Sequence, residues 1–252
     1  MAVALNTLVA EADRYLNVSR FQDYCPNGLQ VEGRPQVSRI VSGVTASQAL
    51  LDAAVEAEAD LVLVHHGYFW KGENPCVVGM KQRRLRTLLQ NDMSLLAYHL
   101  PLDSHPEVGN NAQLARQLDI TVEGPLDPGD ARVVGSIGAL AEPMTARDFA
   151  HRVQAVLGRE PLLVGSERMI RRVGWCSGGG QGYIDRAIAA GVDLYLTGEA
   201  SEQTFHSARE NDVAFIAAGH HATERYGVQA LGDYLARCFA VEHLFIDCPN
   251  PV

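Results

Sequence analysis

The sequence predicts an α/β protein made of two domains of related topology, each a mixed sheet covered by helices. Two observations carry this prediction: short apolar stretches alternate with longer amphipathic ones, and one such block occurs twice. The 252 residues allow one large domain or two modest ones. With 47 % hydrophobic and 20 % charged residues, the composition is that of an ordinary globular protein, which excludes a disordered, collagen-like or coiled-coil chain.

The repeated block joins residues 39–66 to residues 172–199 without a gap, and each copy has the pattern of a strand, a helix and a second strand. The coinciding residues are Arg39/Arg172, Gln48/Gln181, Asp52/Asp185, Ala54/Ala187, Ala57/Ala190, Asp60/Asp193, Leu61/Leu194 and Leu63/Leu196. A second correspondence joins residues 95–103 to residues 216–224, where both copies carry a histidine followed by a carboxylate. We interpret the repeat as an internal duplication; the alternative is chance similarity between ordinary strand–helix–strand units.

Short, almost wholly apolar stretches predict the strands of largely parallel or mixed sheets. These strands are residues 37–44, 60–64, 94–98, 170–176, 193–197, 213–218 and 243–246. The predicted helices are residues 47–58, 81–91, 110–118, 146–157, 183–190, 201–211 and 223–239. Thr145 is placed to cap the helix that begins at residue 146, and Gly158 is placed to end it. The turn-rich stretch 123–130 separates a first domain, residues 1–124, from a second domain, residues 125–252.

Histidines and carboxylates follow three of the predicted strands. They are His65 and His66 after the first, His99 and Asp103 after the second, and His220, His221 and Glu224 after the third. Ligands collect at the carboxyl ends of strands in α/β sheets. Adjacent side chains on a strand point in opposite directions, so His65 and His66 are expected to hold different ions. His220 and Glu224 lie on one face if they begin a helix. Nitrogen and carboxylate donors together suit two divalent cations.

Several neighbouring residues admit two interpretations. His99 either orients Asp103 from behind or packs in the core, and His221 is open to the same doubt. In the loop 66–73, Tyr68 or Trp70 stacks on a planar substrate and Lys71 or Glu73 handles charge; otherwise the aromatics anchor the loop or form a subunit contact. The glycine-rich stretch 177–181 lacks the spacing of known phosphate-binding loops, which favours a tight turn for close helix–sheet packing.

Six motifs, taken together, resemble the NIF-three-like dinuclear metal-centre proteins, and among them the bacterial YbgI branch. The motifs are DYCPNGLQVEG (23–33), VHHGYFWKGE (64–73), HLPLDSHPEVGNN (99–111), SGGGQ (177–181), TGEASEQTFHSARE (197–210) and AGHHATER (218–225). The resemblance implies two intertwined domains, with the C-terminal segment packing on the first. It also implies a toroidal homohexamer, a trimer of dimers, whose metal sites face an internal cavity. The family's ligands fall on His65, His66, Asp103, His220 and Glu224, and members carry the name GTP cyclohydrolase I type 2 homologue.

We therefore expect a hydrolase that uses two divalent cations (Zn, Mn, Fe, Co or Ni) and a metal-bridging hydroxide as nucleophile. By resemblance, the small-molecule substrate is a purine nucleotide. His99, Glu73 and His221 are the candidates for a general acid or base. The alternatives are a metal-loaded regulatory or scaffold ring without turnover, and a ring that binds nucleic acid in its cavity, which the net charge of −9 disfavours.

The sequence contains no apolar stretch near the roughly 20 residues that span a bilayer, so we expect no membrane partner. The five cysteines have neither disulfide nor zinc-ribbon spacing. Free thiols of this kind indicate a cytoplasmic protein.

Overall fold

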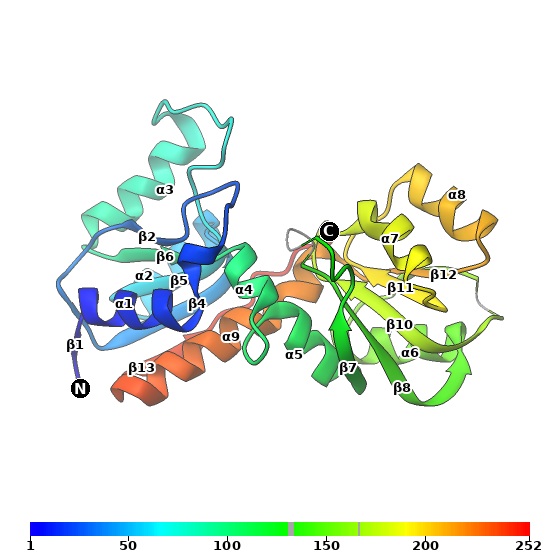
Figure 1. Cartoon of the computed structure of the whole chain (residues 1–252). Helices are drawn as coiled ribbons and strands as arrows, with labels where there is room; N and C mark the ends of the chain where they lie inside the picture. The colour runs from blue at the N-terminus through cyan, green and yellow to red at the C-terminus, as the bar shows by residue number, and fades with distance from the viewer. Residues whose placement is uncertain (131–133, 166) are drawn as a thin grey trace. The chain divides into compact units, whose positions relative to one another are not determined.

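The computed structural model describes residues 1–130, 134–165 and 167–252 and divides into two units (Figure 1). Unit 1 consists of residues 1–109 and 227–248, and unit 2 of residues 110–226 and 249–252. Each unit is a mixed sheet with helices on both faces, which confirms the predicted fold class. Because each unit contains two separate stretches of chain, the two are intertwined along the sequence.

The division of the chain differs from the predicted boundary between residues 124 and 125. The chain enters unit 2 at residue 110, since helix α5 (Asn110–Gln117) packs against strand β7 (Ile120–Pro125). It returns to unit 1 at residue 227, because strand β13 (Glu242–Phe245) pairs with a strand of the unit 1 sheet. The turn-rich stretch 123–130 begins inside β7 and does not separate the units.

Unit 1 is built on a five-stranded sheet. Its order is β13, β4 (Arg39–Thr45), β5 (Leu61–His66), β6 (Ser94–Ala97) and β2 (Gly28–Val31), and only β2 runs antiparallel to its neighbour. Strands β1 (Val3–Ala4) and β3 (Gln36–Val37) form a separate pair. The helices are α1 (Leu5–Tyr15), α2 (Gln48–Glu56), α3 (Gly79–Gln90), α4 (Leu100–Ser104) and part of α9 (His220–Phe239), with a 3-10 turn at Val18–Arg20.

Strand β5 is buried on both faces of this sheet. Leu61 and Leu63 pack with residues of α1 and α9, whereas Val62 and Val64 pack with residues of α2 and α3. All four side chains have no exposed surface. Side chains alternate between the faces of a strand, so a strand covered on both sides must be apolar throughout. This requirement explains the unbroken apolar run that precedes His65.

Unit 2 is built on a six-stranded sheet whose core, β10–β11–β12, is parallel. Its order is β7, β8 (Ser136–Thr145), β10 (Met169–Cys176), β11 (Leu194–Thr197), β12 (Ala214–Ala217) and β9 (Leu162–Val164). One face packs against α5, α6 (Ala146–Leu157) and the start of α9; the other packs against α7 (Ile184–Ala189) and α8 (Glu202–Glu210), with a 3-10 turn at Gln181–Tyr183 before α7.

Helix α6 has the predicted bounds and the predicted signals at its ends. The Thr145 side chain accepts a hydrogen bond from the Asp148 N–H, and Gly158 ends the helix with φ of 73°. Residues 220–226 of α9 belong to unit 2 and residues 227–239 to unit 1. Among the described residues, no helix has both the length and the apolar character needed to cross a membrane.

The two units repeat one hydrogen-bond pattern, centred on Asp60 in unit 1 and on Asp193 in unit 2. Asp60 Oδ2 accepts from the N–H groups of Ser38 and Arg39 at 2.7 and 3.0 Å. Asp193 Oδ2 accepts from the two corresponding N–H groups at 2.9 and 2.8 Å. The pairs β4–β5 and β10–β11 also share their register. These matches support the interpretation of the repeated block as a duplication.

The second sequence correspondence is displaced by one residue. Leu61 pairs with Ser94, and its counterpart Leu194 pairs with Ala214. Ser94 is therefore equivalent to Ala214, and Leu95 to Phe215 instead of the residue after it. Two residues separate this strand from the helix that follows in both units, so His99 and Asp103 are displaced by one residue relative to His220 and Glu224.

Replacing Asp60 by alanine is expected to lower the free energy of unfolding by about 2–3 kcal/mol, because two backbone N–H groups and the Arg34 guanidinium lose their acceptor in a partly buried place. The matched control is Asp193→Ala, whose hydrogen bonds are exposed to water, with an expected loss below about 1 kcal/mol. Urea unfolding measures both. Equal losses in the two variants would contradict this account.

Candidate metal centre

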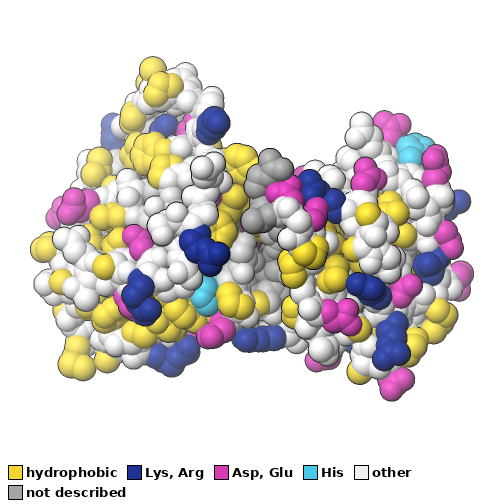
Figure 2. Space-filling view, viewed as in Figure 1, with side chains coloured by type: hydrophobic (Ala, Val, Ile, Leu, Met, Phe, Trp, Pro, Cys, Tyr) yellow, Lys and Arg dark blue, Asp and Glu magenta, His cyan; other side chains and the backbone are white. Residues whose placement is uncertain are grey.

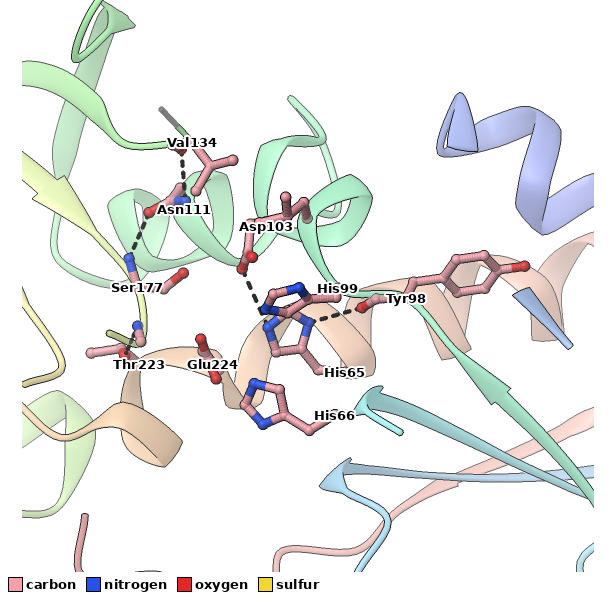
Figure 3. Close-up of polar contacts among 12 residues, drawn as sticks. His65, His66, Tyr98, His99, Asp103, Asn111, Val134, Ser177, Thr223 and Glu224 are labelled. Atoms are coloured by element: carbon pink, nitrogen blue, oxygen red, sulfur yellow. Dashed lines mark hydrogen bonds and ion pairs between the residues drawn. The ribbon is translucent and has the colours of Figure 1, made fainter. Parts of the chain in front are cut away.

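His65 is held in one orientation at the carboxyl end of β5 (Figure 3). Its ring has no exposed surface, and its Nδ1 lies 2.8 Å from the backbone oxygen of Tyr98. A carbonyl oxygen only accepts hydrogen bonds, so Nδ1 carries the proton and Nε2 keeps its lone pair. Nε2 lies 3.5 Å from Asp103 Oδ1. Asp103, in the short helix α4, is 5 % exposed. A buried imidazole nitrogen and a carboxylate oxygen therefore converge on one place in unit 1.

His66 and His99 extend this group. The Nδ1 of His66 lies 3.2 Å from the hydroxyl of Thr45, and the rings of His65 and His66 are 4.5 Å apart. The two rings thus lie beside one another, although neighbouring side chains on a strand are expected to point in opposite directions. The ring of His99 is 5.2 Å from that of His65, and one nitrogen from each of the three histidines falls within 4.8 Å of the others.

Asp23 fixes the ring of His99. Its Oδ1 lies 2.7 Å from His99 Nδ1, while its Oδ2 accepts from the Asn27 side chain and the Leu100 N–H, each at 2.9 Å. Burial by itself raises the pKa of Asp23, but the hydrogen bonds from His99, Asn27 and the Leu100 N–H outweigh it and lower the pKa to about 2. His99 accepts from the Asp103 N–H through its backbone oxygen, at 3.1 Å. This bond belongs to the first turn of α4, and the orienting role of the His99 ring toward Asp103 stays a prediction.

In unit 2, His220 and Glu224 form a second pair of donors on the first turn of α9. His220 Nε2 lies 3.2 Å from Glu224 Oε2, and Glu224 is 3 % exposed. His220 Nδ1 lies 2.6 Å from Glu199 Oε1, while the other oxygen of Glu199 accepts from the Gln181 amide at 3.0 Å. The carboxylate of Glu199 thus fixes the imidazole of His220 through the nitrogen that faces away from Glu224.

The environment of His220 attracts positive charge. Burial by itself lowers the pKa of His220, but hydrogen bonds and charge from Glu224 and Glu199 raise the pKa to about 9. A proton on Nε2 then occupies the place that a cation takes when the imidazole acts as a ligand. Binding of a divalent cation there releases this proton, as is general for histidine ligands. The donors of both units, neutral nitrogens and carboxylate oxygens without thiolates, fit a divalent metal.

The glycine-rich stretch 177–181 packs directly against this pair. A Cβ atom on Gly178, whose φ is +64°, would overlap with Glu224 Oε1 and lie 3.0 Å from His220 Nε2. The N–H of Gly178 donates to Thr223 Oγ1 at 2.9 Å. The stretch is therefore a tight turn, as favoured from its spacing, and its lack of side chains makes room for the two donors of α9.

The loop after His66 contains a residue that packs in the core, Tyr68, and others that stay candidates for substrate binding. Tyr68 is 6 % exposed and its hydroxyl donates to the Ala46 oxygen at 2.8 Å, so it is a core residue and the predicted stacking role is wrong for it. Trp70 stays a candidate: its ring contacts His99 edge-on at 5.0 Å. Lys71 is exposed, with its N–H bound to the Tyr24 oxygen at 2.6 Å.

Glu73 and His221, two of the three candidates for a general acid or base, differ in their surroundings from His99. Glu73 forms an ion pair with Lys81 at 3.0 Å and accepts from the Trp70 N–H at 3.0 Å. The hydrogen bond from Lys81 lowers the pKa of Glu73, so this carboxylate stays ionised and closes its own loop. His221 donates its backbone N–H to the Val252 oxygen at 3.1 Å, and it belongs to no group of converging donors among the described residues.

The residues that hold the histidines were not identified from the sequence. They are Asp23, Thr45 and Glu199, whose side-chain oxygens lie within hydrogen-bond distance of the Nδ1 atoms of His99, His66 and His220. One signal was present for Glu199, since the repeated block aligns it with His66. Asp23 and Thr45 lie far from their histidines in sequence, and no spacing rule connects them.

Comparison with known proteins gives the family. A family model described as Duf34/NIF3 (NGG1p interacting factor 3) matches residues 3–251. This chain belongs to the NIF3 family. Its curated relatives include a protein of Pseudomonas aeruginosa, named GTP cyclohydrolase 1 type 2 homolog, that is 78 % identical over the full length of both chains. A protein of Vibrio cholerae with the same name is 52 % identical over 98 % of this chain and all of its own.

A solved structure of protein ybgI, described as of unknown function, has the same fold as this NIF3-family chain. It aligns with a TM-score of 0.95 and 52 % identity, covering 99 % of this chain and 100 % of its own. The resemblance stated from the motifs is thereby confirmed, down to the YbgI branch. The NIF3-family chain also contains groups of histidine and carboxylate side chains that can bind metal ions.

Substituting Gly178 by alanine tests the contact between the glycine-rich stretch and the donors of α9. The new methyl group must displace the Glu224 carboxylate, and the positive φ adds strain of about 1–2 kcal/mol. We expect a lower midpoint of thermal unfolding and an affinity for Zn²⁺ or Mn²⁺ reduced about tenfold to a hundredfold. Gly182→Ala is the control, because its Cβ meets nothing within 4 Å. Unchanged metal affinity in both variants would contradict the prediction.

Asp23→Asn is expected to destabilise the protein in a way that depends on pH. The folded pKa of Asp23, about 2, lies below its unfolded value of about 3.9. Its contribution is therefore complete above pH 4 and disappears as the pH falls through 2. Urea unfolding should show a difference between wild type and variant of about 2 kcal/mol at pH 7 that shrinks below pH 4. A difference that stays constant down to pH 2.5 would contradict this assignment.

Proposed function

We propose that this protein is a hydrolase that uses two divalent cations held by His65, His66, Asp103, His220 and Glu224. One observation carries the proposal: each of the three histidines is fixed through Nδ1, by an oxygen of Tyr98, Thr45 or Glu199. Metal-binding histidines in proteins are held in this way, since it sets the tautomer and aims Nε2. His243 is held by Asp233 through Nδ1 as well, but in His65 and His220 the Nε2 atom also lies within 3.5 Å of a buried carboxylate oxygen, from Asp103 and Glu224.

We further propose that the ligands of the two units serve the same pair of ions. Unit 2 offers two ligands, His220 and Glu224, which is fewer than the three protein ligands that hold a catalytic zinc. Unit 1 offers His65, His66 and Asp103. Together the five supply two ions while leaving coordination positions for water and substrate, as a catalytic centre requires.

The chain's own residues would then move the proton. Divalent ions, when bound, lower the pKa of a bound water toward 7 and polarise a substrate oxygen. His99 is the residue we assign to proton transfer, because Asp23 holds its Nδ1 proton and leaves Nε2 to accept a proton from water or to give one to a leaving group. The edge of Trp70 packs on His99 at 5.0 Å and restricts its ring to this orientation.

The substrate class we propose is a purine nucleotide, after the name that the Pseudomonas and Vibrio relatives carry. Trp70 is the aromatic residue of the loop 66–73 that lies beside the histidines, with its ring 6.0 Å from that of His66. A base stacked on Trp70 gains about 1–3 kcal/mol, a value typical of base–aromatic stacking.

The proposal predicts that His65→Ala and Glu224→Gln each weaken both ions, even though the two residues belong to different units. We expect two ions per chain in the wild type, fewer than one in each variant, and a hundredfold or greater loss of nucleotide hydrolysis, at roughly 3 kcal/mol or more of transition-state stabilisation. Elemental analysis and a nucleotide panel measure the two effects. His206→Ala, which removes an exposed imidazole on α8, is the matched control.

Two outcomes speak against the proposal. Full metal content and full turnover in His65→Ala would remove the assigned ligand set. Loss of one ion in each variant, with the other bound at wild-type affinity, would mean that the two units hold separate centres.

The other predicted functions gain no support of their own. Figure 2 shows Lys and Arg mixed with Asp and Glu on the face in view, whereas a protein that tracks a phosphate backbone presents a basic stripe. The homohexamer stays a prediction from the resemblance.

A further inference from the structure

Unit 2 contains a pocket of about 410 Å³ at the carboxyl ends of β11 and β12. Gly198 and Glu199, which follow β11, and Gly219, which follows β12, line it together with Arg159 and Leu162. Pockets that hold small molecules have volumes of roughly 300–1,000 Å³ and lie at this edge of α/β sheets. None of the ligands predicted from the sequence lines this pocket, so it is a separate feature of unit 2.

Arg159 is the unusual residue of this pocket. Its Nη1 is buried without a hydrogen-bond partner, and within the described part of the chain Arg159 forms no hydrogen bond or ion pair. The side chain as a whole is half-buried and lines the pocket. Other partly buried arginines of the unit do have partners: Arg186 pairs with Asp127, and Arg225 donates to the Leu157 oxygen. Arg159 therefore brings to the pocket a cation that has no partner within the described part of the chain.

The guanidinium of Arg159 is seated against the main chain. A Cβ atom on Gly219 would overlap with Nη1, and the φ of Gly219 is +101°, which side chains rarely adopt. Gly219 therefore makes the space in which the guanidinium lies. The next residue along the chain is His220, the first donor of α9.

A single residue connects the pocket to the candidate metal centre. Glu199 lines the pocket and accepts from His220 Nδ1 at 2.6 Å. Its second oxygen accepts from the Gln181 amide at 3.0 Å. A molecule in the pocket is thus one side chain away from the imidazole that we assign to a metal ion.

We propose that Arg159 anchors an anionic group of the substrate, either a phosphate or a carboxylate, in this pocket. The guanidinium fork matches both groups and binds them through two parallel hydrogen bonds. Because Glu199 repels an anion, the anionic group lies at the Arg159 side, and a neutral or hydrogen-bond-donating part of the molecule faces Glu199. This inference rests on the proposed function for its link to hydrolysis, but the anion site itself does not require metal.

Titration calorimetry of the full-length, metal-loaded protein with inorganic phosphate and with succinate tests the site. We expect Arg159→Gln to weaken the tighter of the two anions about tenfold to a hundredfold, as the loss of a charge-assisted pair predicts. Arg159→Lys, which keeps the charge and loses the fork, should fall in between. Arg171→Gln removes the same charge from an exposed position and should bind like the wild type. Tighter phosphate points to a phosphate ester, and tighter succinate to a carboxylic acid.

The same titrations in a His65→Ala background separate this inference from the proposed function. If the Arg159-dependent difference persists there while no nucleotide is hydrolysed by the wild type, the anion site stands and the hydrolase proposal fails. If Arg159→Gln and wild type bind both anions equally, with unchanged unfolding temperatures, the anion site is refuted whatever the turnover. Where a substrate is hydrolysed, loss of the anchor should raise KM and leave the metal content unchanged.

Discussion

The candidate centre depends on how the protons of its imidazoles are placed. A neutral imidazole has one proton and one lone pair, so committing the proton at Nδ1 to an oxygen leaves the lone pair at Nε2 with a fixed direction. His65, His99 and His220 are arranged in this way, by a backbone carbonyl and two carboxylates, while the Nδ1 of His66 lies 3.2 Å from the Thr45 hydroxyl, which can donate or accept. Thr45 ends β4, Tyr98 and Glu199 follow β6 and β11, and Asp23 lies in the segment before β2.

The sequence predicts the candidate metal ligands but not all of the residues that hold their imidazole rings. His65 and His66 are visible because a strand buried on both faces leaves an unbroken apolar run that ends where the sheet ends. Asp23 and Thr45 are not predictable in this way, because only the folded chain places them beside their histidines. The same holds within the loop after His66, where Tyr68 and Trp70 have equal claims in the sequence and only burial separates them.

The fold is predictable to a similar depth. The parallel cores of both sheets follow from apolar runs, but β7, β8 and β9 do not, because they carry exposed or polar residues toward the edges of their sheet. The domain boundary fails for a different reason. A single cut cannot describe a chain that leaves unit 1 at residue 110 and re-enters it at residue 227. Packing decides whether a helix such as α5 belongs to the unit before it or to the unit after it, and the local sequence does not reveal this packing.

His66 and Glu199 occupy the same position of the duplicated block, and they no longer do the same work. One copy presents an imidazole; the other presents a carboxylate that steadies an imidazole elsewhere. Two separate chains of identical sequence would carry the same side chain at both places. Fusion of the two halves into one polypeptide gives each place its own codon. A duplicated block within one chain can thus carry different side chains at matching positions, which two identical chains cannot.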